Sequence, residues 1–388
     1  MTDALAEQVL MQARRSISIY DRSGVVEEFE DAFRAYVGLP QVIATSSGTA
    51  ALHSIFYGAG LGPGDEVICA DYGFFATITP LVLLGARPVF VDCSLDGTIS
   101  VPAAEAAITS RTRAIVVTHM WGQPADLPAL IELCRRTGLL LFEDCSHAHG
   151  ARLGGAVVGS FGHAAAWSMQ AQKAVWAGEG GVMGTKDPAL YERALLLGHF
   201  NLRALAEIPE SSPNFAFAFT GTGLKYRAHP LALAMALPQL RTLDQLVEGR
   251  QRSAAVLMTA LTAIPGLRLL VRLGDDIVHG FYGLVALIDP KACGFDRETF
   301  LRALEAENIC LAWAPGQMGA MSELPLFTRS AADEAAGASQ PLPNSRHITS
   351  TAVRFFVPST PADLTGDTRI SVVAEAIAKV GAALSRGE

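Results

Sequence analysis

Five short apolar runs alternate with helical stretches in the first half of the chain, and this alternation constrains the fold most. The runs cover residues 42–45, 66–69, 88–92, 114–118 and 139–144. They are nearly all apolar, as expected of strands that are covered on both faces of a parallel sheet. A helix is predicted between two of them, over 125–137, with Gly138 at its end. The pattern therefore predicts βα units around a mostly parallel sheet, which is the α/β class.

A second region follows a helical stretch predicted over 231–261, which we expect to break at Pro238. Its pattern predicts a smaller α+β arrangement with three elements. These are a strand over 281–288, a helix over 297–307 and a closing helix over 368–386 that is capped by Asp367.

The chain has 388 residues, which suits one large domain and one smaller domain. We predict a large domain over 1–250, including an N-terminal arm, and a small C-terminal domain over 251–388. The Gly-, Ser- and Pro-rich segment 335–345 is predicted to be a mobile loop that covers a site or is disordered.

Charge and composition exclude several classes of protein. The formal net charge is −8, which argues against nucleic-acid binding because that needs clustered Lys and Arg. No uncharged apolar stretch is long enough to span a membrane, and charges interrupt the first twenty residues, so neither an anchor nor a secretory signal is expected. The cysteines lack CxxC spacing, which predicts buried thiols in the cytoplasm rather than disulfides or zinc ligands. They are Cys69, Cys93, Cys134, Cys145, Cys293 and Cys310.

Small residues with the sequence SSGTAAL occupy positions 46–52, between a predicted strand and a predicted helix. The first N–H groups of such a helix and its dipole favour an anion, so the turn suits a phosphate. Taken alone, these residues are more often explained by plain helix capping.

Charged residues appear abruptly at the end of an apolar strand in the sequence EDCSHAHG at 143–150. Ligands of parallel α/β sheets bind outside such strand ends. Burial of Asp144 is costly unless a cation meets it, and a protonated pyridine nitrogen is one such cation. The alternatives are a helix cap or a structural arginine partner. His147 and His149 lie two apart with no acidic pair to complete a ligand set, so no metal site is predicted.

Lys173 is the only lysine before Lys186, and small uncharged residues surround it. An amine that is desolvated in this way has a lowered pKa and reacts readily with an aldehyde. The glycines at 178–181 allow close approach of a planar ligand. By itself, the segment is better explained as a surface lysine before a glycine turn.

Together these segments resemble the DegT/DnrJ/EryC1/StrS family of sugar aminotransferases, which have the aspartate-aminotransferase type of fold (fold type I). The resemblance extends over residues 24–381. Its strongest markers occur in the family's order. They are SSGTAAL at 46–52, GPGDEVI at 62–68, GARPVFVD at 85–92, GQPADL at 122–127, EDCSHAHGA at 143–151 and GEGG at 178–181.

The resemblance implies roles for individual residues toward pyridoxal 5′-phosphate. Lys173 matches the lysine that forms the aldimine and carries the proton, and Asp144 matches the partner of the pyridine nitrogen. His147 matches a residue near the phenolic oxygen, and Phe74 matches the aromatic that stacks on the ring. The phosphate cradle is matched by Gly48, Thr49, Ala50 and Ser168.

Three positions depart from the usual family pattern. Lys225 stands where an Asn commonly reaches the phosphate of the neighbouring subunit, which implies a homodimer with shared active sites. Gln170 replaces a frequent His, and Trp176 replaces a frequent Thr. Gln170, together with the sequence Lys-Tyr-Arg at 225–227, resembles the members that act on keto-cyclitols and unactivated sugars.

We therefore predict a pyridoxal-phosphate-dependent aminotransferase. It moves an amino group from glutamate or glutamine to a keto-sugar or keto-cyclitol by way of pyridoxamine phosphate. Alternatives are a nucleotide-linked sugar as acceptor, an elimination or aromatising reaction with the same cofactor, and a regulatory protein without turnover. Candidates for acceptor contacts, each also explicable as structural, are Gln170, Arg227, His229, Tyr282 and Trp313.

Overall fold

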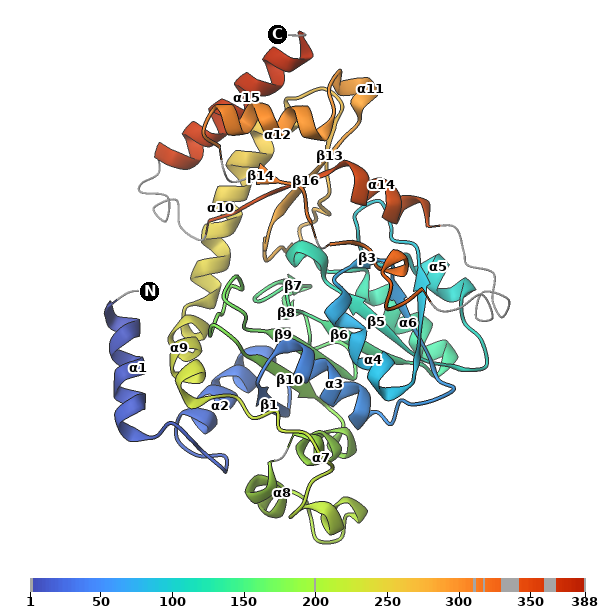
Figure 1. The fold of residues 1–388 in the computed structure, drawn as a ribbon, viewed down its shortest axis with the longest axis vertical. Helices are drawn as coiled ribbons and strands as arrows, with labels where there is room; N and C mark the ends of the chain where they lie inside the picture. Colours follow the sequence, from blue (N-terminus) through green and yellow to red (C-terminus); the bar gives the residue numbers. More distant parts are fainter. Residues whose placement is uncertain are drawn as a thin grey trace.

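The computed structural model describes residues 3–198, 200–309, 312–316, 318–328, 342–358 and 368–386. Its large α/β part is built on a seven-stranded sheet with the order β1-β10-β9-β6-β5-β2-β4 (Figure 1). β10 is antiparallel to both of its neighbours, and the other six strands run in one direction. The strands are β1 (Gln41–Thr45), β2 (Glu66–Ala70), β4 (Arg87–Val91), β5 (Thr112–Thr118), β6 (Leu140–Asp144), β9 (Ala164–Ser168) and β10 (Gly181–Thr185).

All five predicted strands are present, with ends within two residues of the expected positions. The mostly parallel α/β class is therefore confirmed. β9 and β10 were not predicted. They complete the sheet between β6 and β1, so the sheet is wider than the apolar runs indicated.

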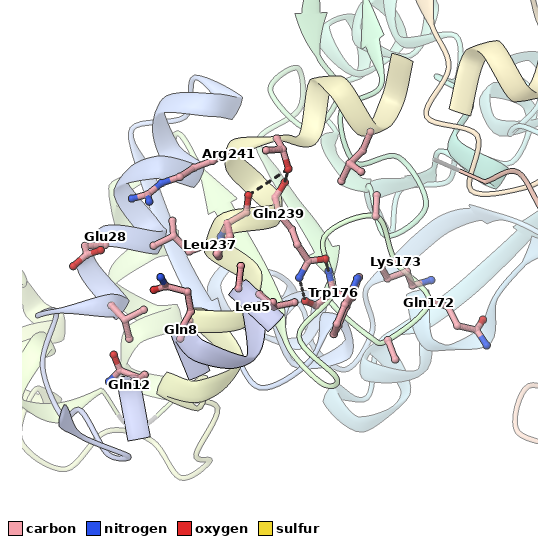
Figure 2. Close-up of a pocket in the computed structure, with 18 of the residues that line it drawn as sticks. Leu5, Gln8, Gln12, Glu28, Gln172, Lys173, Trp176, Leu237, Gln239 and Arg241 are labelled. Carbon is pink, nitrogen blue, oxygen red and sulfur yellow. Dashed lines mark hydrogen bonds between the residues drawn. The ribbon is translucent and has the colours of Figure 1, made fainter. Parts of the chain in front are cut away.

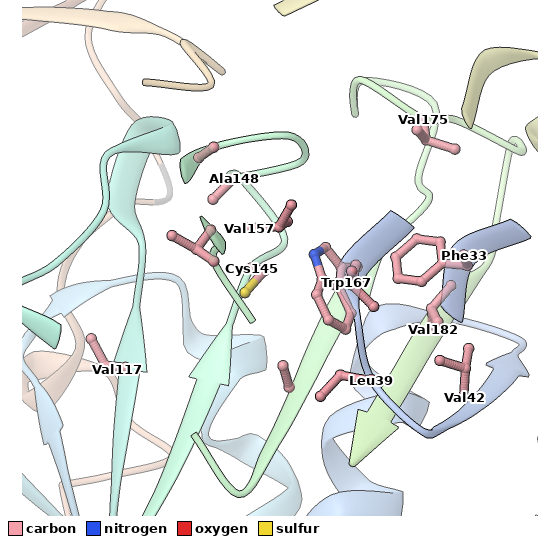
Figure 3. Packing of buried hydrophobic residues seen from close by; sticks show 14 of the residues in the cluster. Phe33, Leu39, Val42, Val117, Cys145, Ala148, Val157, Trp167, Val175 and Val182 are labelled. Atoms are coloured by element: carbon pink, nitrogen blue, oxygen red, sulfur yellow. The ribbon is translucent and has the colours of Figure 1, made fainter. Parts of the chain in front are cut away.

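Helices cover both faces of this sheet because alternate strand residues point to opposite sides. On one face the core includes residues of α2 (Val25–Val37), α6 (Leu127–Thr137) and α9 (Pro230–Arg241). Figure 3 shows the part of this core around Trp167, whose ring meets Phe33 edge-on with centroids 4.9 Å apart. The opposite face is covered by α3 (Gly48–Gly58), α4 (Thr79–Leu84) and α7 (Pro188–Leu197).

The predicted helix over 125–137 is α6, with Asp126 as its N-cap and Gly138 in the left-handed conformation after its end. The remaining helices of the large part are α1 (Asp3–Arg15), α5 (Val101–Ala106) and α8 (Asn201–Glu207). α1 packs against α9 at the edge of the molecule (Figure 1).

The expected helix break at Pro238 was wrong. Pro238 lies inside α9, which continues to Arg241, and the break falls at Thr242 before α10 (Leu243–Thr262). Proline has no N–H to donate to the carbonyl of Ala234, so α9 lacks one backbone hydrogen bond at this turn but continues through it.

α10 joins the two parts of the chain, because Val247 belongs to a core of the large sheet and Ala254 to a separate C-terminal core. The predicted domain boundary at residue 250 falls on this helix and stays a prediction. The second core packs helices α10, α12 (Arg297–Ala306) and α15 (Thr368–Ser385) on a four-stranded sheet (Figure 1). Its strands are β11 (Leu267–Leu269), β13 (Leu284–Ile288), β16 (Ala352–Phe355) and β14 (Ala312–Trp313).

The predicted elements of the second region are largely present. α12 and α15 occupy the expected helices, although Asp367 lies outside the described residues. The strand begins at Leu284 rather than 281, because residues 281–283 form a loop toward the large sheet. The shorter elements of the structure are β3 (Tyr72–Gly73), β7 (Arg152–Leu153), β8 (Ala156–Val157), β12 (Ile277–Val278), β15 (Gly319–Ala320) and α11 (Pro290–Cys293).

Hydrogen bonds tie α14 (Pro343–Thr351) to the large sheet. The Ser345 hydroxyl donates to Asp71 over 2.6 Å, and the Ser345 N–H donates to Asp92 over 2.9 Å. The predicted loop over 335–345 is thus helical from residue 343, and residues 335–341 lie outside the described residues.

The described cysteines are free and buried, namely Cys69, Cys93, Cys134, Cys145 and Cys293. Among the helices of the described ranges, none combines the length and apolar character that a membrane span requires.

Candidate active site

The carboxyl ends of the parallel strands gather the predicted residues at one edge of the sheet. Asp144 ends β6, where it pairs with Thr118 of β5 and Ala166 of β9. Ser168 ends β9, and Thr45 ends β1 just before the small-residue turn. Because ligands of α/β sheets bind outside this edge, the strand order brings three separate sequence segments to one site.

Asp144 is buried, with 4% of its surface exposed. Its carboxylate accepts hydrogen bonds from the Thr77 hydroxyl at 2.6 Å and from the Ser146 N–H at 3.0 Å. Across the described part of the chain, no Lys or Arg forms an ion pair with it. The structural-arginine alternative therefore does not explain this carboxylate, and a cationic ligand group would offset its desolvation.

Lys173 lies on the loop between β9 and β10, and its N–H donates to the Gln170 carbonyl at 2.9 Å. Its Nζ lies 4.3 Å from the centre of the Tyr282 ring. Burial lowers the pKa of this ammonium group to about 8, although the charge of Asp144 acts in the opposite direction. The lysine is therefore a partly desolvated amine, as its sequence context predicted, and not a solvated surface group.

The lowered pKa of Lys173 predicts an unusual pH dependence of its reactivity. Only the neutral amine attacks an aldehyde, so the modification rate should rise with pH and level off above about 8. The rate of reductive methylation of Lys173 by formaldehyde and cyanoborohydride, followed by peptide mass spectrometry from about pH 6 to about pH 10, measures this. Exposed Lys291 is the internal reference for the pH dependence of the reagents themselves. A Lys173 rate that follows Lys291 would contradict the prediction.

His147 is buried in a stack of rings that connects the two parts of the chain. It lies parallel to Tyr282, with centroids 4.1 Å apart, and the Trp121 N–H points to its Nδ1 at 3.4 Å. Burial, with the nearby Lys173 charge, lowers the pKa of His147 well below its usual value. The imidazole is thus neutral, with one nitrogen able to donate and the other to accept.

The small-residue turn combines capping with a close backbone approach. The Ser47 hydroxyl accepts from the Ala50 N–H at 3.0 Å, so the capping interpretation is confirmed. A Cβ on Gly48 would lie only 2.7 Å from Cβ of Ser168, so glycine is required there. Since the Ala50 N–H is already engaged, an anion at this turn would meet the backbone of Gly48 and exposed Thr49.

The segment 225–229 lies beside this turn, because the Tyr226 carbonyl accepts from the Ser46 N–H at 2.8 Å. Lys225 is exposed, and Arg227 stacks over the ring of Tyr20 at 5.1 Å. His229 caps α9 by accepting from the Leu231 N–H, which is a structural role.

A cavity of about 1080 Å³ opens beside Lys173 and extends to α1 (Figure 2). Gln170 reaches it only indirectly, since its side-chain oxygen accepts from the Gln172 N–H at 2.9 Å. Phe74 is partly buried against Phe75, with ring centroids 4.3 Å apart. The residues that line the cavity include Gln172, Lys173, Trp176, Arg250, Trp313 and Arg354.

A buried group with metal-ligating atoms lies behind the site, formed by His119, Glu143 and Cys145. Both oxygens of Glu143 are already occupied. They accept from the backbone N–H groups of residues 159, 161 and 162 and face His119 Nε2 at 3.1 Å. This carboxylate therefore organises the 159–162 turn, and we assign it a structural role.

Comparison with known proteins identifies the fold and the family. A model of the DegT/DnrJ/EryC1/StrS aminotransferase family matches residues 5–376. The chain belongs to this family. It is therefore an enzyme of a pyridoxal-phosphate-dependent aminotransferase family, and its expected fold is confirmed.

Two sequence relatives and one solved structure are similar to most of this chain. The spore coat polysaccharide biosynthesis protein SpsC of Bacillus subtilis (strain 168) is 34% identical over 285 residues, which are 73% of each chain. A putative L-glutamine:3-amino-2,3-dideoxy-scyllo-inosose aminotransferase of Micromonospora echinospora is 33% identical over 285 residues, 73% of this chain and 66% of that relative. The crystal structure of DesI with its TDP-sugar product is 27% identical with a TM-score of 0.81, covering 98% and 91% of the two chains.

Three residues of this DegT/DnrJ/EryC1/StrS family member were missed by the sequence reasoning, namely Thr77, Trp121 and Arg354. Trp121 has φ 60°, an unusual value for a residue other than glycine, and its indole donates to the Tyr72 hydroxyl at 2.9 Å. The GQPADL block that follows Trp121 was its only local signal. Arg354 lies in a short apolar strand, β16, which carries no motif.

Proposed function

We propose that this enzyme transfers an amino group from glutamate or glutamine to a keto-sugar or keto-cyclitol, with Lys173 as its catalytic residue. The observation that carries the proposal is a partly buried amine, Lys173, whose pKa is about 8 and whose charge interacts with the buried carboxylate of Asp144. A lysine with a lowered pKa at the wall of a cavity is typical of a catalytic site.

The residues at the sheet edge fit pyridoxal 5′-phosphate. Lys173 offers an amine for its aldehyde, Asp144 an anion for its pyridine nitrogen, and the turn at Gly48 a backbone surface for its phosphate. His147 and Phe74 supply a neutral hydrogen-bonding ring and an aromatic face. When bound, the cofactor supplies an electron sink that acidifies the Cα–H of the amino donor.

The protein's own residues then carry out the proton movements. Lys173 Nζ in its neutral form would accept the proton from the donor Cα and, once protonated, would deliver it to C4′ of the cofactor. Its pKa near 8 keeps both protonation states accessible near neutral pH. Asp144 holds a proton on the ring nitrogen, and Thr77 fixes the direction of the carboxylate through the 2.6 Å hydrogen bond.

The choice of reactants rests on the family and on the two curated relatives. One of these is named for an L-glutamine donor and a cyclitol acceptor. Trp176, one of the departures from the family pattern, lines the cavity with Lys173 and offers an acceptor an uncharged surface. We further propose a homodimer in which Lys225, exposed beside the phosphate turn, reaches the cofactor phosphate of the second copy.

Incubation of the purified enzyme with glutamate, in the absence of an acceptor, tests the reaction class. We expect conversion of the bound cofactor to its amine form with release of one 2-oxoglutarate per site, because transamination separates into two halves. Addition of keto-cyclitols, free keto-sugars and nucleotide-linked keto-sugars should restore the aldehyde form only with the true acceptor class. Release of ammonia or water-loss products without 2-oxoglutarate would instead identify an elimination.

A further inference from the structure

The chain has four tryptophans, and three of them have partners for their rings. Trp121 and Trp167 are at most 2% exposed and pack against other aromatic rings. The Trp313 ring faces the Arg354 guanidinium, whose Cζ lies 4.7 Å from the ring centre. Trp176 takes part in no ring stacking or cation contact with the described residues.

The backbone of Trp176 is held on both sides of the indole. The Gln239 side-chain amide of α9 accepts from the Trp176 N–H at 3.3 Å and donates to the Trp176 carbonyl at 2.7 Å. The chain neighbours Val175 and Ala177 are buried in the core of the large part, where Figure 3 shows Val175. The fold itself therefore fixes where the indole begins, without help from a bound molecule.

The indole of Trp176 is partly exposed and lines the same cavity as Lys173 (Figure 2). Both hydrogen bonds of Trp176 with the described residues are made by its backbone. An indole has a broad apolar face with negative partial charge. Covering such a face removes apolar surface from water, which is favourable. A molecule held at Lys173 can therefore gain binding free energy by covering the face of Trp176.

The acceptor of the proposed function is a polyhydroxylated ring, and the orientation of its hydroxyl groups decides whether it can cover an indole. When the hydroxyl groups are equatorial, the axial C–H bonds form an apolar face on each side of the ring. These C–H bonds carry partial positive charge and suit the negative face of an indole. Axial hydroxyl groups would interrupt this apolar face and would lose their water without a partner.

We propose that Trp176 determines acceptor specificity, because its indole stacks on the C–H face of keto-cyclitols and keto-sugars whose hydroxyl groups are equatorial. This inference rests on the proposed function and deepens it by naming the stereochemical class of the acceptor. The threonine that is frequent at this place in the family offers no such face. Glutamate and glutamine are open chains without a ring face, so Trp176 serves the half-reaction with the acceptor.

Binding of two inositol isomers to the cofactor-loaded enzyme tests the stacking without turnover. The hydroxyl groups of scyllo-inositol are all equatorial, whereas allo-inositol carries axial hydroxyl groups. Saturation-transfer NMR measures both dissociation constants. We expect the wild-type enzyme to bind scyllo-inositol more tightly, by on the order of 10-fold. Trp176→Leu, which keeps an apolar side chain without an aromatic face, should lose this preference, and Trp176→Phe should keep most of it.

The two half-reactions separate a specificity role of Trp176 from a structural one. In Trp176→Leu, we expect kcat/KM for the keto-cyclitol that reoxidises the amine form of the cofactor to fall on the order of 10-fold. The half-reaction with glutamate should change by less than about 2-fold. A residue that only supported the Lys173 loop would affect both half-reactions alike and would lower the Tm, which is measured in parallel.

The outcomes distinguish this inference from the proposed function. A wild-type enzyme without a preference for scyllo-inositol, or a Trp176→Leu variant that keeps the preference, would overturn the role of Trp176 alone. Equal losses in the two half-reactions would overturn it as well, because they indicate a structural role. A wild-type enzyme that releases no 2-oxoglutarate from glutamate would instead overturn the proposed function, and the binding comparison would still decide whether Trp176 recognises the ring.

Discussion

Replacement of Lys173 by alanine is expected to abolish amino transfer, with turnover reduced by at least about 10⁴-fold. The residue supplies both the amine that joins the cofactor aldehyde and the base that moves the donor proton. Lys173 is the one lysine among the described residues that line the cavity, so no second amine can replace it. Turnover with glutamate measures the loss of amino transfer. The visible absorbance of the cofactor-loaded protein measures the loss of the link between residue 173 and the cofactor.

A matched control is Lys291→Ala, which removes an exposed lysine on α11 and should change neither measurement. Retention of the visible absorbance in Lys173→Ala, or of more than about 1% of turnover, would reject Lys173 as the cofactor-linking residue. Partial rescue by added primary amines would support a proton-transfer role, because a small amine can enter the space left by the side chain.

The sequence predicted the strands that are apolar and missed the two that are made of small residues. β9 has the sequence AAAWS and β10 has GVMGT, which are poor in the β-branched residues typical of strands. Packing explains their composition. A Cβ on Gly181 would lie 2.2 Å from the Ser47 carbonyl, and one on Gly184 would lie 2.6 Å from a Leu39 methyl. Such requirements come from neighbours far away in sequence, so local patterns do not reveal them.

The residues of the site differ in the same way, because some are marked by local sequence patterns and others come together only through the fold. Asp144 could be placed at a strand end because a charged residue closes an apolar run, whereas Lys173 was singled out by its place in the ordered set of family motifs. Tyr282 was only one of several candidates, and Arg354 lay in an ordinary apolar strand. Both come from the small domain, and their proximity to Lys173 depends on how α14 and the 279–282 loop attach to the large sheet. The Gly280 N–H, for instance, donates to the Gly122 carbonyl at 2.8 Å.

Replacement of Asp144 by asparagine is expected to reduce turnover by about 10² to 10⁴-fold and to weaken cofactor binding. Asparagine keeps the size of the side chain but removes the charge that would hold a proton on the cofactor ring nitrogen. Removal of one partner from a buried charged pair typically costs about 3–5 kcal/mol, which corresponds to a loss of about 10² to 10⁴-fold. Steady-state turnover and titration of the apoprotein with cofactor measure the two effects.

Two controls separate the charge of Asp144 from its geometry. Thr77→Val removes the 2.6 Å hydrogen bond but keeps the carboxylate, so a loss of only about 10-fold is expected. A cofactor analogue that is methylated on the ring nitrogen carries a permanent positive charge and should restore part of the activity of Asp144→Asn. An Asp144→Asn variant with wild-type turnover would show that the carboxylate does not meet the cofactor.

The Asp144→Asn variant should also change the pKa of Lys173. The negative charge of Asp144 favours the protonated form of Lys173, so its removal should lower the pKa of Lys173 further below about 8. In the apoprotein, the pH at which methylation of Lys173 levels off should therefore move downward in Asp144→Asn and stay unchanged in Thr77→Val. Because this shift needs no cofactor, it tests directly whether the two residues act on each other, and an unchanged midpoint would show that they do not.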